Sequence, residues 1–126
     1  MDAGNGDNLV IGDSGRVRAA SADAPQFLGQ SMTFGKIETT AFDDGGIDAI
    51  TTGMGLDLVL GGDEGDTINV GGGNNVVLGD DGAITYTGAE FGGTDAGDDT
   101  DASDIDEIVS TSTTAAGGTD AIASGS

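Results

Sequence analysis

Residues 51–82 read TTGMGLDLVLGGDEGDTINVGGGNNVVLGDDG, and this stretch decides the fold because its pattern recurs every nine residues. A polar residue marks each step, glycines precede it, and a large apolar residue follows it two positions later. The polar positions are Asp48, Asp57, Asp66 and Asn75, and the apolar positions are Ile50, Val59, Ile68 and Val77. Self-similarity at a fixed short period is typical of repeat architectures.

A longer repeat encloses the nine-residue one. Residues 4–17, GNGDNLVIGDSGRV, align with residues 71–84, GGGNNVVLGDDGAI. Residues 37–53 align in the same way with residues 109–125, as GGIDAITTG against GGTDAIASG shows. The chain therefore contains about two copies of one module, and both of its ends fall inside a copy.

The domain organisation follows from these repeats. We expect a single repetitive segment, 1–126, composed of two modules, 1–67 and 68–126, with inserted loops at 19–31 and 89–107. The second loop is rich in aspartate, a composition typical of a solvated or ion-collecting segment.

Strand signals flank both loops. Arg16-Val17-Arg18 should pair with a strand returning over 32–40, and Ile84-Thr85-Tyr86 with one returning over 108–114. Each pair is expected to be an antiparallel hairpin that projects from the stack. No stretch has the period of an amphipathic helix.

The charge balance restricts the partners. The chain carries 23 acidic residues and three basic ones, a formal net charge of −20. Such a chain repels itself when compact, so either it is disordered or multivalent cations neutralise it as it folds. Nucleic-acid binding needs clustered basic residues, which are lacking. No apolar run reaches the length that would insert into a membrane.

The chain contains no cysteine and no histidine. Thiolate and imidazole metal sites are therefore excluded, and so are the usual nucleophile and base pairs of hydrolases. The metal chemistry that remains is that of carboxylate, amide and carbonyl oxygens, which suit calcium.

The glycine, aspartate and apolar positions resemble the haemolysin-type (RTX) calcium-binding nonapeptide repeat, GGxGxDxUx, in which U is a large apolar residue. The resemblance covers 43–81 well, and 3–13 and 117–126 less closely. It implies an all-β fold, a parallel β-roll or β-solenoid of nonapeptide turns with hairpin or loop insertions. It also implies several calcium ions, held between turns of successive coils.

With eighteen residues per coil, Asp48 should stack on Asp66, and Asp57 on Asn75. The turn before Asp66 has Glu64 where the repeat has glycine, so either the turn is distorted or Glu64 is an extra ligand. Asn8 and Asn75 fit turn formers as well as ligands. The candidate metal ligands are Asn8, Asp13, Asp48, Asp57, Asp63, Asp66, Asn75, Asp80 and Asp120.

We expect a non-catalytic, calcium-binding structural repeat of a large secreted bacterial-type protein. It would fold on calcium and act as a rigid extender or a self-assembling element, with other copies of itself bound through open ends of the stack. The alternative is an adhesin-type binding module whose inserted loops contact a surface, a glycan or ice. The N-terminus lacks the basic and apolar regions of a signal peptide, so type I-like export to the cell surface or medium is expected.

Overall fold

The computed structural model describes residues 1–19, 34–86, 105–113 and 117–125, and within these residues the chain forms β-strands and no α-helix. Most strands are short, as the nine-residue repeat predicts. Their bounds are β1 Asp2–Gly4, β2 Leu9–Ile11, β3 Gly15–Ala19, β4 Phe34–Thr39, β5 Ala49–Thr52, β6 Leu58–Leu60, β7 Thr67–Val70, β8 Val76–Leu78, β9 Gly82–Tyr86, β10 Ile105–Ser110 and β11 Ala121–Ser124.

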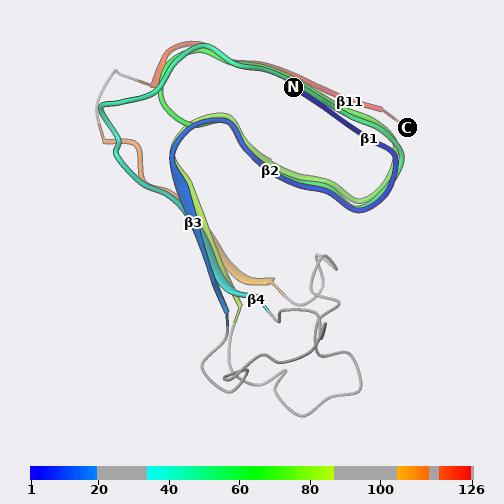
Figure 1. The fold of residues 1–126 in the computed structure, drawn as a ribbon, viewed down its shortest axis with the longest axis horizontal. Helices are drawn as coiled ribbons and strands as arrows, with labels where there is room; N and C mark the ends of the chain where they lie inside the picture. Colours follow the sequence, from blue (N-terminus) through cyan, green and yellow to red (C-terminus); the bar gives the residue numbers. More distant parts are fainter. Residues whose placement is uncertain (20–33, 87–104, 114–116, 126) are drawn as a thin grey trace.

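The strands form three sheets (Figure 1). Sheet A has the order β1-β5-β7-β11 and sheet B has the order β2-β6-β8, and all their pairs are parallel. Sheet C has the order β10-β9-β4-β3, and all its pairs are antiparallel. In the end-on view of Figure 1, the strands of each sheet lie nearly on top of one another.

The prediction of a parallel β-roll is wrong. The chain forms three small sheets of mixed direction, and the whole of sheet C is antiparallel. The reason lies where the nine-residue pattern stops, after Gly12-Asp13 and Gly79-Asp80. The following strands, β3 and β9, have five residues each, and each pairs with a returning strand. The returning strand β4 also pairs with β9, with Ile37 opposite Ile84, so the two expected hairpins are one sheet and not separate projections.

The inserted loops, 19–31 and 89–107, lie largely outside the described residues. One end of the second loop is nevertheless described and differs from expectation. Strand β10 begins at Ile105, which pairs with Tyr86, and a bulge follows between Ile105 and Glu107. The apolar side chain of Ile105 packs against the core beneath sheet C, which extends the strand into a segment whose acidic composition favours a loop.

The eighteen-residue coil is confirmed at the centre of the stack. Ile50 pairs with Ile68 in sheet A, and Val59 pairs with Val77 in sheet B. These strands are too short to be stable alone. Stacking buries their apolar side chains against identical positions in the next layer.

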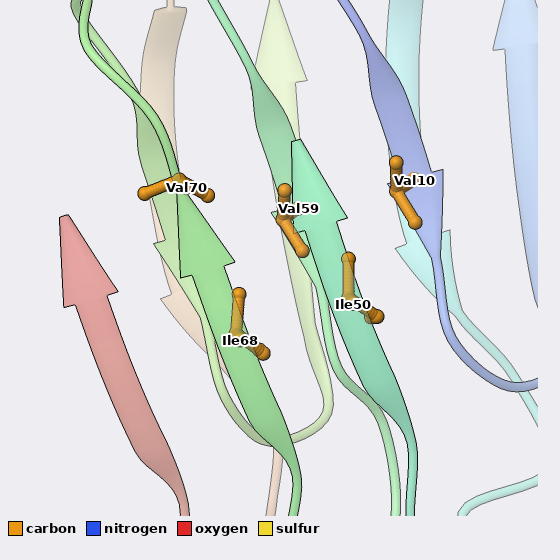
Figure 2. Packing of buried hydrophobic residues seen from close by; sticks show 5 residues of the cluster. All are labelled: Val10, Ile50, Val59, Ile68 and Val70. Carbon is orange, nitrogen blue, oxygen red and sulfur yellow. The ribbon is translucent and has the colours of Figure 1, made fainter. Parts of the chain in front are cut away.

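Sheet B is the middle layer of the fold, because its side chains alternate between two cores. On one side, Val59 packs with Val10 and with the sheet A residues Ile50, Ile68 and Val70 (Figure 2). On the other side, Leu58 and Leu60 pack against sheet C, in a cluster that also contains Ile37, Ile84 and Tyr86. All three residues of β6 are fully buried, which explains why this strand reads as a continuous apolar run.

Candidate functional site: stacked turn aspartates

Two ladders of polar side chains run along the turns that lead into the parallel strands. The first precedes sheet A and contains Asp48, Asp66 and Asp120, which we name the carboxylate ladder. The second precedes sheet B and contains Asn8, Asp57 and Asn75, which we name the amide ladder. The predicted stacking of Asp48 on Asp66 and of Asp57 on Asn75 is therefore confirmed. The stacking of Asn8 on Asp57 and of Asp66 on Asp120 was not foreseen.

Four of the six ladder side chains accept a backbone N–H of the neighbouring layer, namely Asp57, Asp66, Asn75 and Asp120. The Asp48 N–H donates to Asp66 Oδ1 at 2.8 Å, and the Asp66 N–H donates to Asp120 Oδ1 at 2.9 Å. In the amide ladder, the Asp57 N–H donates to Asn75 Oδ1 at 3.1 Å. One oxygen of each of these side chains thus has a structural role. The partners of the other polar atom of each side chain differ between the two ladders.

In the amide ladder the remaining polar atoms find partners within the protein. The Thr52 hydroxyl donates to Asp57 Oδ2 at 2.7 Å, and Asn8 Nδ2 donates to Asp57 Oδ1 at 2.8 Å. Asn75 Nδ2 donates to the Gly71 carbonyl at 3.0 Å. Asp57 is fully buried but well supplied with hydrogen bonds, which is how buried carboxylates are normally tolerated. This ladder is held by protein hydrogen bonds.

The carboxylate ladder differs. Asp66 is 1% exposed, and its Oδ2 is buried with no hydrogen-bond partner in the described part of the chain. The pKa of Asp66 is raised from 3.8 to about 6, chiefly by burial and also by the charges of Asp120, Asp48 and Asp13, against the lowering effect of the Asp48 N–H. A buried carboxylate with one orphaned oxygen and like charges around it is unfavourable unless something neutralises it.

Three further predicted ligands lie beside this ladder, in or next to the turns at Gly12-Asp13, 61–66 and 79–82. Asp13 accepts the N–H groups of Gly46 at 3.0 Å and Asp63 at 2.9 Å. One oxygen of Asp63 and one of Asp80 are also buried without a hydrogen-bond partner among the described residues. Burial raises the pKa of Asp13 and of Asp80, and neighbouring carboxylates raise each further.

Glycine brings backbone oxygens to the same place. A Cβ added to Gly61 would lie 2.0 Å from the Gly79 carbonyl oxygen and 2.2 Å from Asp66 Oδ2. These two oxygens therefore converge on the Gly61 backbone, which only a residue without a side chain allows. Glu64, three residues further on, takes a φ of 70° and has an exposed side chain, so the turn keeps its shape despite the missing glycine, at some cost in strain.

The chain's own cations lie elsewhere. Its only basic residues are Arg16, Arg18 and Lys36, and all three form ion pairs with Glu38 on β4. Hydrogen bonds from Lys36 and Arg16 lower the pKa of Glu38. No ion pair found among the described residues includes an aspartate of the carboxylate ladder, so the protein itself supplies no counter-charge there.

Residues 1–19, 34–86, 105–113 and 117–125 contain no group of three or more carboxylates arranged to hold a metal ion by themselves. An ion at the carboxylate ladder would therefore have to take carbonyl oxygens as well as carboxylates. This donor set fits calcium, which commonly accepts backbone carbonyls and tolerates irregular geometry.

No helix in the described part of the chain has the length and apolar character needed to cross a membrane. Comparison of the chain with protein-family models, with curated proteins and with solved structures finds no match.

Proposed function

We propose that the chain is a non-catalytic, calcium-binding structural repeat of a larger secreted protein. Calcium ions bind along the carboxylate ladder, through Asp48, Asp66 and Asp120, with Asp13, Asp63 and Asp80 beside them. The observation that carries the proposal is Asp66: it is almost completely buried, one of its oxygens has no partner in the described residues, and no basic residue pairs with it.

Calcium suits this position better than magnesium does. Magnesium requires near-ideal octahedral geometry and keeps several of its waters, whereas calcium accepts six to eight oxygens in irregular arrangements. The oxygens that converge at Gly61 come from a carboxylate and a backbone carbonyl. A divalent ion there removes the repulsion between neighbouring layers, so binding is coupled to folding.

Coupling of folding to calcium gives the structural role a physical basis. With a net charge of −20, the chain resists compaction where calcium is scarce and folds where calcium is plentiful, as it is outside cells. The folded stack then serves as a rigid extender. Among the described residues, β1 and β11 are the edge strands of sheet A, and their outer backbone groups offer places where further copies can add.

The test is a calcium titration followed by circular dichroism, starting from chelator-treated protein, with magnesium in a parallel titration. We expect a β spectrum to appear with calcium and not with magnesium. Asp66→Asn should weaken calcium binding at least tenfold, whereas Asp44→Asn, a change at an exposed turn residue, should leave it unchanged. A complete β spectrum in chelator, unaltered by calcium, would contradict the proposal.

Self-association is tested separately by sedimentation velocity of the calcium-loaded protein. A rigid extender that polymerises through its sheet edges should show concentration-dependent growth. A monomer at all concentrations would leave calcium binding intact as a proposal and remove assembly from it.

A further inference from the structure

A hollow of about 200 Å³ has a lining that includes none of the residues of the carboxylate ladder. Its lining comes from two corners where the chain passes from sheet C to sheet A, after β4 and after β10, which run together at the left of Figure 1. Asp81, which immediately precedes β9, completes the lining. The lining residues are Phe42, Asp43, Asp81, Thr111, Ser112 and Thr113.

The most buried group in the lining is Asp81, which is 5% exposed. Its backbone carbonyl accepts the Thr111 N–H at 2.9 Å and the Ser110 hydroxyl at 3.3 Å. Its carboxylate has no hydrogen-bond donor among the described residues. Neither oxygen of this carboxylate is among the fully buried ones, so the Asp81 side chain can accept a hydrogen bond from a group that enters the hollow.

The hydroxyl groups of Thr111, Ser112 and Thr113 are the only side-chain hydrogen-bond donors in the lining of the hollow. Thr111 Oγ1 is buried and has no hydrogen-bond partner in the described part of the chain. The six lining side chains include two carboxylates and three hydroxyls, and none carries a nitrogen donor. The hollow is therefore an acceptor-rich, negatively charged site, which repels phosphates and carboxylates and attracts donor-rich cations.

The aromatic ring of Phe42 distinguishes this hollow from a site that would bind a metal ion through carboxylates alone. Its ring is 49% exposed at the tip of a turn that the Asp44 N–H closes onto the Ala41 carbonyl at 3.0 Å. Ala41 adopts a φ of 60°, a left-handed conformation that is unfavourable for alanine. The chain thus holds an aromatic ring in solvent beside two carboxylates, at a cost in backbone strain. A ring in that position contacts an organic cation through its face and its apolar surface.

We infer that this hollow binds an alkylammonium group, with the ammonium between Asp43 and Asp81 and the alkyl stem against Phe42. An ammonium brings three N–H donors and a positive charge to a site that offers only acceptors and hydroxyls. Two sources carry this chemistry, a lysine side chain of a partner protein and a free polyamine. The chain's own lysine, Lys36, is already paired with Glu38. This site goes beyond the proposed calcium function and does not depend on it.

The experiment uses ¹⁵N-labelled, calcium-loaded protein and amide chemical shifts. n-Butylammonium chloride is the probe, and n-butanol is the neutral control of the same length. We expect n-butylammonium to shift the amides of 42–43 and 111–113 in a saturable manner, with n-butanol causing no such shifts. Putrescine and a lysine amide blocked at its α-amino group then distinguish the two sources, because a polyamine site favours the former and a peptide site the latter.

Variants decide whether the binding is specific. Phe42→Ala should weaken n-butylammonium binding about two- to fivefold, the usual worth of an exposed cation–π contact, and Asp81→Asn should weaken it more. Ile47→Ala removes another exposed apolar side chain, 74% exposed and outside the lining, and should have no effect. Equal shifts with n-butanol, or binding unaltered in Phe42→Ala, would overturn the inference. So would displacement of the probe by extra calcium equally in wild type and Phe42→Ala, which would indicate a metal site.

Discussion

The carboxylate of Asp120 accepts the backbone N–H of Asp66 at 2.9 Å, although the two residues lie 54 positions apart in the sequence. The same bond joins Asp48 to Asp66 across 18 positions. Asp66 is thus enclosed on both sides by acidic residues of adjacent layers. It is the most buried acid of the carboxylate ladder because a layer covers it above and below.

In chelator, the stability of the folded chain should increase as the pH falls from 7 to 5. Because the pKa of Asp66 rises from 3.8 to about 6 in the folded state, the folded state binds a proton more tightly than the unfolded state does. Stability is therefore gained as pH falls through this window and lost as pH rises through it. Circular dichroism in chelator at several pH values measures the gain in the folded fraction as the pH falls, and Asp66→Asn should reduce the slope of this gain. Because the pKa values of Asp13 and Asp80 are raised as well, part of the slope should remain in Asp66→Asn. A stability that decreases steadily between pH 6 and pH 5 would contradict this account.

Gly61→Ala should destabilise the protein by about 1–3 kcal/mol, the usual cost of forcing extra volume into a packed site. The added Cβ would meet the Gly79 carbonyl at 2.0 Å and Asp66 Oδ2 at 2.2 Å, and calcium affinity should fall with stability. Gly46→Ala is the matched control, because a Cβ there meets nothing within 4 Å. Equal effects of the two substitutions on thermal stability would show that the convergence of oxygens at Gly61 is unimportant.

Ile68→Ala should cost about 2–5 kcal/mol, as large-to-small changes in cores do. Ile68 is fully buried, and it pairs with Ile122, which occupies the same column in β11 but is 49% exposed. Ile122→Ala should therefore cost less than about 1 kcal/mol. Urea denaturation of both variants in saturating calcium makes the comparison. If a monomeric sample loses as much stability from Ile122→Ala as from Ile68→Ala, the burial seen in sheet A is incorrect.

Glu38→Gln should weaken sheet C by about 1 kcal/mol or less, because exposed ion pairs contribute little individually. The three basic side chains that surround Glu38 are 38–56% exposed. The loss should shrink at high salt, which screens charges near the surface. Hydrogen exchange at β3 and β4 locates the effect, and a loss that is independent of salt would indicate that packing matters there more than charge.

The resemblance to the nonapeptide repeat was sufficient to predict the short strands, the eighteen-residue coil and the pairing of Asp48 with Asp66. The pairing of Asp66 with Asp120 was also within reach, because 45–53 and 117–125 are copies of one segment. Sheet C was not predictable in the same way. Its central pair, β4 with β9, joins segments that share no repeat. The long segment 20–33 precedes β4, and the long segment 87–104 separates β9 from β10. The register there is set by burial of Ile37 and Ile84, which a local pattern does not reveal.

The alkylammonium hollow escaped the sequence argument for a different reason. Repeats direct attention to positions that recur, whereas Asp81 is a position that changed: it aligns with Ser14 in the other copy. Likewise, Phe42 has no apolar counterpart in the second copy, because it aligns with Thr114. Departures from an internal repeat are therefore as informative for specific sites as the repeat itself is for the scaffold.

Paired strands are separated by different numbers of residues in the middle and at the outside of the stack, and this difference affects how the chain folds. Neighbouring strands in the middle of the stack, β5 with β7 and β6 with β8, are 18 residues apart, whereas β2 pairs with β6 across 49 residues and β11 pairs with β7 across 54. Closing a longer loop costs more entropy, and contacts between distant residues form more slowly. The segment 48–78 should therefore form the nucleus, and the outer layers dock onto it from both sides. Growth of the stack then proceeds outward from its centre in both directions, so the two ends of the chain are the last parts to order.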